Sequence, residues 1–307
     1  MAKLSDRIEN VLNESRMLLL GGQVLLGFSY RICFEPGFER ITSAARLAEV
    51  CGVGIMTAGL GWLIWPAAFH QISARGLPTE AVEKFTTRIL DWALLPLAFG
   101  IALTVYPVTN ALRLPQPAWI GAVTGLFALA AWYGGLLSQR SIQNRKRAKS
   151  SQKPDQRDQS TLSDRIKKVL IECRMALPGA QAFLGFQFAI VFAQSFDRLP
   201  RSSQLVHFAS LLSTTIAIVL LIAPAAYHRL VEGGEDTERF HRVASRLLLA
   251  ALVFLAPGMA GDLFVVIRQI TGSGPLATWI SGLLLVVFYF LWFGVSAWKR
   301  KARAIDT

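Results

Sequence analysis

Residues 47–69 read LAEVCGVGIMTAGLGWLIWPAAF, and this stretch decides the fold. It is apolar along almost its whole length and shows no strict alternation of apolar and polar residues. A helix rises about 1.5 Å per residue, so about 20 residues cross the roughly 30 Å hydrocarbon core of a bilayer. Inside a bilayer a segment must satisfy its own backbone hydrogen bonds, which a helix does and a lone strand does not. The stretch therefore predicts a transmembrane helix.

Seven further stretches have the same character, and together the eight predict an all-α integral membrane protein with about eight transmembrane helices. The other seven cover residues 17–34, 89–110, 117–138, 175–196, 205–227, 247–266 and 276–298. The composition agrees with this prediction. Of the 307 residues, 53% are hydrophobic and only 17% are charged, whereas charged residues make up about 25% of a soluble domain.

The chain contains the same unit twice. LSDRI at 4–8 recurs at 162–166, an offset of 158 (162 − 4), and PAAFH at 66–70 recurs as PAAYH at 224–228. Because each unit holds an even number of helices, both enter the membrane in the same direction, and we expect parallel repeats. The predicted organisation is a first four-helix unit at 1–142, a basic disordered linker at 143–161 and a second four-helix unit at 162–307.

Positive charge gathers at one face of the predicted bundle. Residues 139–168 hold ten Lys or Arg against three Asp, and the tail from Lys299 holds four Lys or Arg against one Asp. Lys and Arg collect on the cytoplasmic side of inserted helices, so we expect both termini in the cytoplasm. The basic linker and tail are expected to attract anionic lipid headgroups. Charge placed beside membrane segments does not favour nucleic-acid binding.

The motifs of soluble enzymes are absent from the sequence. It has no Gly-rich phosphate loop, nucleophile elbow, paired metal-ligand motif or Cys-x-x-Cys. We therefore expect no enzymatic activity, no metal site and no cofactor. Cys33, Cys51 and Cys173 are interpreted as reduced fillers, although a disulfide between the first two is an alternative, because both would lie near the outer ends of neighbouring helices.

Both units repeat a polar group at the start of their first helix. Glu14, Arg16 and Gln23 correspond to Glu172, Arg174 and Gln181. Each glutamine lies four residues before a glycine, so a neighbouring helix could approach closely and hydrogen-bond across that face. The group predicts either interhelical hydrogen bonds or a polar path for a ligand or ion.

His70 and His228 each end a helix behind a Pro-Ala-Ala segment. Proline removes a backbone hydrogen bond and favours a kink. A histidine at this boundary can relay protons or bind haem, and it can equally serve as a polar cap near headgroups. We include both histidines in the predicted ion path.

A charged stripe follows in each unit. Glu80, Lys84 and Arg88 recur as Glu238, Arg242 and Arg246. The spacing i, i+4 and i+8 places each triplet on one helix face. We interpret these residues as a solvated cytoplasmic stripe, and the alternative is a charged vestibule over the two histidines.

Asp262 lies well inside the seventh predicted span. A carboxylate inside a membrane predicts a proton or cation site. Its counterpart in the first unit is Thr104, so only the second unit would contain this site.

These motifs resemble an uncharacterised bacterial family of four-helix membrane proteins. The second unit matches best, with ECRMALPGAQ at 172–181 and PAAYHR at 224–229, while the first unit has Leu20 in place of Pro178 and Gln71 in place of Arg229. Members usually have one unit, and some are labelled sodium:proton antiporters. The resemblance implies a fused pair of units in a bacterial cytoplasmic membrane.

The sequence favours a small secondary transporter, coupled to protons or sodium. A non-enzymatic membrane scaffold or accessory subunit is the alternative, and a haem-binding redox protein is a third interpretation. The substrate and the protein partners are not predicted.

Overall fold

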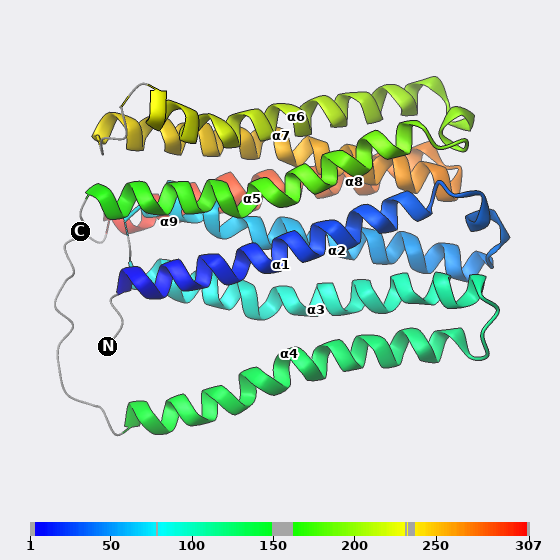
Figure 1. The fold of residues 1–307 in the computed structure, drawn as a ribbon, viewed down its shortest axis with the longest axis horizontal. Helices are drawn as coiled ribbons and strands as arrows, with labels where there is room; N and C mark the ends of the chain where they lie inside the picture. The colour runs from blue at the N-terminus through cyan, green and yellow to red at the C-terminus, as the bar shows by residue number, and fades with distance from the viewer. Residues whose placement is uncertain (1–3, 78, 149–161, 231, 233–236, 306–307) are drawn as a thin grey trace.

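The computed structural model describes residues 4–77, 79–148, 162–230, 232 and 237–305, and most of these residues are helical (Figure 1). The helices are α1 Leu4–Ile32, α2 Ser43–Ser73, α3 Glu80–Ala111, α4 Pro117–Ala148, α5 Leu162–Val191, α6 Arg201–Leu230, α7 Glu238–Thr271, α8 Gly274–Tyr289 and α9 Ser296–Ile305. A π-helical segment, η3 (Phe290–Val295), joins α8 to α9 in one continuous rod. Two short 3-10 turns are η1 Pro36–Arg40 and η2 Phe196–Arg198.

The predicted all-α membrane fold of two four-helix repeats is confirmed. Counting the α8–α9 rod as one, four long helices precede residues 149–161 and four follow them within the described part of the chain. Helix α4 continues through Ala148, which is the sixth residue of the predicted linker at 143–161. Residues 149–161 of that linker lie outside the described residues. The cysteines are free: Cys33 and Cys173 are buried and Cys51 is exposed.

The two units begin their third helices with the same cap. The Thr79 hydroxyl accepts from the Val82 N–H at the start of α3, and the Thr237 hydroxyl accepts from the Phe240 N–H at the start of α7. A threonine in this position satisfies one of the free amides of the first helical turn. Helix α7 ends at Gly272, whose φ of +67° suits a residue without a side chain.

Six helices in the described part are long and apolar enough to cross a membrane by length and composition. They are α2, α3, α5, α6, α7 and the α8–α9 rod, and the apolar part of α4, Pro117–Tyr133, is shorter. The outside of the bundle is apolar, since Phe192, Trp279 and Phe127 are between 87% and 73% exposed. Such a surface belongs in lipid, because monomeric soluble proteins rarely expose large apolar patches.

The helices run nearly parallel to one long axis, and α1 and α5 pack side by side in the middle of the bundle (Figure 1). Both of these helices start at the same end, which confirms that the repeats are parallel. Helix α4 lies at one edge against α3, and α6 with α7 lies at the other edge. The N- and C-termini are found at the same end of the bundle.

The last helix of the second unit crosses to the first unit. The Trp292 indole N–H donates to the Gly61 carbonyl of α2 at 2.8 Å, and the Trp65 N–H donates to the Ser296 hydroxyl at 3.3 Å. The Phe288 ring fills the space that Gly61 leaves by having no side chain. The α8–α9 rod therefore fastens α2 to the second unit.

Candidate functional site

The first buried polar cluster lies toward the end of the bundle that holds the termini, and its centre is the Glu172 carboxylate of α5. The His70 Nδ1 of α2 contacts one carboxylate oxygen, and the Gln71 amide donates to the other. The side chains of Glu172 and His70 are both 0% exposed. Burying an ion costs several kcal/mol, roughly, unless partners of this kind compensate it. We call Glu172, His70 and Gln71 the inner cluster. Because α2 and α5 belong to different units, this cluster requires two units, either fused in one chain or associated as a dimer.

A line of polar groups leads from the inner cluster to the surface. Arg165 of α5 donates to Glu238 of α7 at 2.9 Å and lies 3.3 Å from the His241 Nδ1. His241 and Gln71 both lie close to Gly76. A Cβ on Gly76 would lie 2.7 Å from the His241 Nε2 and 3.7 Å from the Gln71 Oε1. The Glu238 side chain is 54% exposed and that of Arg165 21%. The polar line therefore extends from solvent toward the inner cluster, where His241 interacts electrostatically with His70, but the His241 Nε2 and the Gln71 Oε1 form no hydrogen bond with a described residue.

A second buried cluster, toward the opposite end, is centred on Asp262 of α7. The Gln187 amide of α5 donates to Oδ2 of Asp262 at 2.6 Å, and the His207 Nδ1 of α6 lies 3.1 Å from Oδ1. The other imidazole nitrogen, Nε2, lies 3.0 Å from the Gln187 carbonyl oxygen. Asp262 and His207 are each 1% exposed.

The hydrogen-bond geometry of this second cluster, which we call the outer cluster, indicates which nitrogen of His207 is protonated. A carbonyl oxygen only accepts hydrogen bonds, so the His207 Nε2 must be protonated. The His207 Nδ1 lies 3.1 Å from Oδ1 of Asp262, but neither atom forms a hydrogen bond of standard geometry with a described residue. The pair is therefore a close, buried contact between two titratable groups.

Glycines on α7 allow α6 to come close enough for this contact. Gly258 faces the Thr214 hydroxyl, and Gly261 faces the Ser210 hydroxyl. A Cβ at Gly261 would overlap the Ser210 side chain. Small residues at a helix interface let membrane helices pack closely, and here they position His207 beside Asp262.

The first unit has polar residues at the same three positions. The offset of 158 pairs Gln187 with Ser29, His207 with Glu49 and Asp262 with Thr104. Glu49 of α2 is 1% exposed and lies beside Ser29 of α1. No described residue forms a hydrogen bond of standard geometry with its carboxylate. Each unit thus places a titratable residue at this depth of its second helix.

An open pocket of about 320 Å³ lies at the same end of the bundle. Its lining includes Cys33, Glu35, Glu39 and Ser195. Cys33 is also near enough to Glu49 to interact with it electrostatically. The pocket, which we call the outer vestibule, therefore brings solvent close to the buried Glu49.

The two clusters are well separated along α5. Gln187 lies 15 residues beyond Glu172 (187 − 172), which is about 22 Å along a helix. Buried Met175, Ala176 and Phe183 occupy the intervening part of α5. Near the midpoint the amide of Gln23, 2% exposed, lies against Gly179.

Some of the residues that the sequence singled out meet in the inner cluster, and others do not. Glu172 and His70 are in contact, and Glu238 belongs to the polar line beside them. His228, in contrast, is half-buried with its ring 4.6 Å from the Phe240 ring. Asp262 is in the outer cluster.

The remaining candidates lie on the outside of the bundle. Glu80 and Lys84 form an exposed ion pair at 2.9 Å. The other exposed candidates are Glu14, Arg16, Arg88, Arg174, Gln181, Arg242 and Arg246. The charged stripe is therefore solvent-facing or headgroup-facing, and its exposed Glu238 also pairs with Arg165 of α5.

Sequence reasoning missed five members of these clusters, namely Gln71, His241, Gln187, His207 and Glu49. A usable signal existed for the last two, because they are titratable residues at the same repeat position inside apolar stretches. The first three gave no comparable signal, since their partners lie on other helices and only packing brings them together.

Comparison with known proteins agrees with the duplicated architecture. A family model described as "Family of unknown function (DUF6328)" matches the chain twice, at residues 2–135 and 155–296. The two matches correspond to the two structural units. No curated protein and no solved structure matches the chain.

Proposed function

The chain belongs to this family of unknown function, and we propose that it is a proton-coupled secondary transporter built from two fused units. The observation that supports the proposal most directly is the buried Asp262–His207 pair, in which a carboxylate and an imidazole lie 3.1 Å apart and are each 1% exposed. Ionisable residues inside a membrane are costly and are commonly found in proton relays and ion pathways. A histidine beside a carboxylate is a group that can accept and release protons.

The second support is that buried carboxylate–histidine pairs are found toward both ends of the bundle. The outer pair lies at the same end as the vestibule and Glu49, and the polar line of Arg165, Glu238 and His241 lies on the surface side of the inner Glu172–His70 pair. Buried Met175, Ala176 and Phe183 lie between the two pairs, with the amide of Gln23 near the midpoint. A continuous proton wire would dissipate a gradient, whereas two separated sites suit alternating access, in which proton transfer accompanies a change of shape.

The orientation that we propose follows from the charge distribution. The basic residues at 139–168 and in the C-terminal tail favour an orientation with both termini and the inner cluster on the cytoplasmic side. The outer vestibule then faces the outside of a bacterial cytoplasmic membrane. In this orientation the inward proton-motive force would load the Asp262–His207 pair from the vestibule.

Liposomes that contain the purified chain and a pH-sensitive dye test the proposal. We expect the dye to respond to an imposed sodium, potassium or pH gradient, and we expect Asp262→Asn and Glu172→Gln to lower the rate at least about tenfold. That fold-change corresponds to about 1.4 kcal/mol. Glu80→Gln, which alters an exposed ion pair, is the matched control and should transport at the wild-type rate.

Size-exclusion chromatography of each variant separates loss of transport from loss of fold. No dye response of the wild type to any of the three gradients would overturn the proposal. Full activity of a well-folded Asp262→Asn protein would remove Asp262 from the mechanism.

A further inference from the structure

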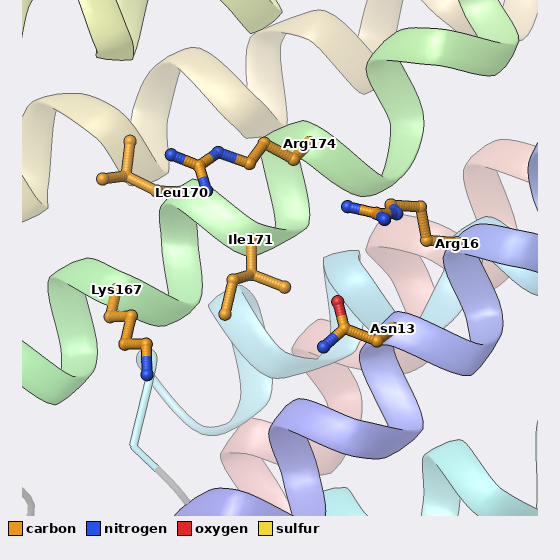
Figure 2. A pocket seen from close by; sticks show the side chains of 6 residues that line it. All are labelled: Asn13, Arg16, Lys167, Leu170, Ile171 and Arg174. Carbon is orange, nitrogen blue, oxygen red and sulfur yellow. The ribbon is translucent and has the colours of Figure 1, made fainter.

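A basic pocket lies between α1 and α5, at the end of the bundle where both helices begin (Figure 2). It measures about 180 Å³ and is lined by Asn13, Arg16, Lys167, Leu170, Ile171 and Arg174. Arg16 comes from α1, and Lys167 and Arg174 come from α5 (Figure 2). Arg16 and Arg174 are repeat-related (16 + 158), so each unit contributes one guanidinium to the rim.

Of the side chains that the structure describes, three cationic ones and no acidic one line the pocket. Among the described residues, no carboxylate forms an ion pair with Arg16 or Arg174. Arginine presents a planar fork of N–H donors that matches the oxygens of a phosphate, and basic pockets between transmembrane helices bind phospholipid headgroups. The chemistry of the lining therefore fits a phosphate group.

An apolar groove of about 460 Å³ continues along the same pair of helices. Its lining includes Val24 and Phe28 from α1 with Ala182, Gly185 and Ala189 from α5. Arg31, which is paired with Glu35, also lines the groove, at the end away from Arg16. Nothing lies within 4 Å of the position that a Cβ on Gly185 would occupy, so this glycine keeps the groove open.

The basic pocket and the groove lie on one side of the helix pair. On α5, residues 167, 171, 174, 182, 185 and 189 of the two linings are spaced three, four or eight residues apart, which is the spacing of one helix face. On α1, residues 13, 16, 24 and 28 are likewise spaced three, eight and four residues apart, so they lie near one face of that helix. The two hollows therefore follow one seam.

The length of this seam matches one leaflet of a bilayer. Val24 and Phe28 lie 8 and 12 residues beyond Arg16, which is about 12 and 18 Å along a helix. Half of the roughly 30 Å hydrocarbon core is about 15 Å. A phosphate held at Arg16 would therefore place its acyl chain in the groove.

We propose that this seam is a binding site for one anionic phospholipid of the leaflet that faces the N-terminus. Its phosphate lies between Arg16 and Arg174 with Lys167 beside it, and an acyl chain lies against Val24, Phe28 and Gly185. The site bridges the two units, so the bound lipid holds α1 and α5 together. The proposal is independent of any transport activity.

Thermal unfolding of the purified full chain in detergent tests the headgroup part of the site. The probes are phosphatidylglycerol, phosphatidylcholine and inorganic phosphate. We expect phosphatidylglycerol alone to raise Tm, since a ligand that binds the folded state stabilises it. The double variant Arg16→Gln/Arg174→Gln should lose most of that shift.

The matched control is Arg88→Gln/Arg246→Gln, which removes two exposed, repeat-related arginines on α3 and α7. It should keep the full shift. Equal shifts in the two double variants would overturn the proposal. An equal response of the wild type to phosphatidylcholine would show that the headgroup charge is not recognised, and an equal response to inorganic phosphate would show a free-anion site; either result would also overturn it.

The acyl-chain part is tested with Gly185→Leu, which fills the groove, against Gly282→Leu, which adds the same side chain at another open position, on α8. Native mass spectrometry of protein extracted from phosphatidylglycerol-containing membranes counts the bound lipids. We expect Gly185→Leu to lose a tightly held phosphatidylglycerol that wild type and Gly282→Leu retain. Equal retention in the two variants would contradict the assignment of the groove.

Discussion

The two units share a sequence pattern, yet their equivalent positions do different things. Glu172 of the second unit is fully buried against His70 of the first, while its counterpart Glu14 is exposed and His228 packs on Phe240. The α8–α9 rod fastens onto α2, whereas α4 lies at the edge of the bundle along α3. The Glu172–His70 contact is thus buried between the units, while the equivalent residues Glu14 and His228 are exposed and half-buried, respectively.

The largest expected effect tests that difference at the repeated glutamate. Glu172→Ala removes the partner of buried His70 and Gln71, and breaking a buried pair of this kind costs about 3–5 kcal/mol. Glu14→Ala changes an exposed residue and should stay within about 0.5 kcal/mol of wild type. Unfolding titrated with sodium dodecyl sulfate measures both. Equal destabilisation would mean that the two units are more symmetric than the structure shows.

The next effect concerns the repeated glycine on the α1–α5 seam. A Cβ on Gly27 would overlap the Phe186 ring, whereas one on its counterpart Gly185 would meet nothing within 4 Å. Gly27→Leu should therefore destabilise the bundle by about 1–3 kcal/mol, because overpacking displaces neighbours. Gly185→Leu should be nearly neutral in detergent without added phospholipid. The same titration applies, and a neutral Gly27→Leu would contradict the close approach of α1 to Phe186.

The smallest effect compares two tryptophans in the last helix of each unit, where the repeat offset becomes 160 (292 − 132). Trp292→Phe removes the hydrogen bond to the Gly61 carbonyl while keeping an aromatic ring, and should cost about 0.5–1.5 kcal/mol. Trp132 is only half-buried, on α4. Trp132→Phe should cost less, and thermal unfolding of the two variants side by side tests the order.

The repeat pattern predicted the fold well but predicted the site incompletely. It selected His70, Glu172 and Asp262, which are central to the two clusters. Comparison of the two units also shows Gln71 where the second unit has Arg229. The amide of Gln71 donates a hydrogen bond to Glu172. The repeat pattern did not find Gln187, because the contact of Gln187 with Asp262 is defined only by how α5 packs against α7. It also missed His207, although His207 and Glu49 are titratable residues at the same repeat position.

The sequence by itself determined that this is an all-α membrane protein made of two parallel four-helix units. Hydrophobic length and internal repetition are local properties, and the bilayer thickness converts them directly into helices. Only the tertiary structure decided which repeated residues are buried and which face lipid. The reason is that burial of these residues depends on contacts between the two units: the α8–α9 rod holds α2, and His70 and Gln71 of α2 reach Glu172.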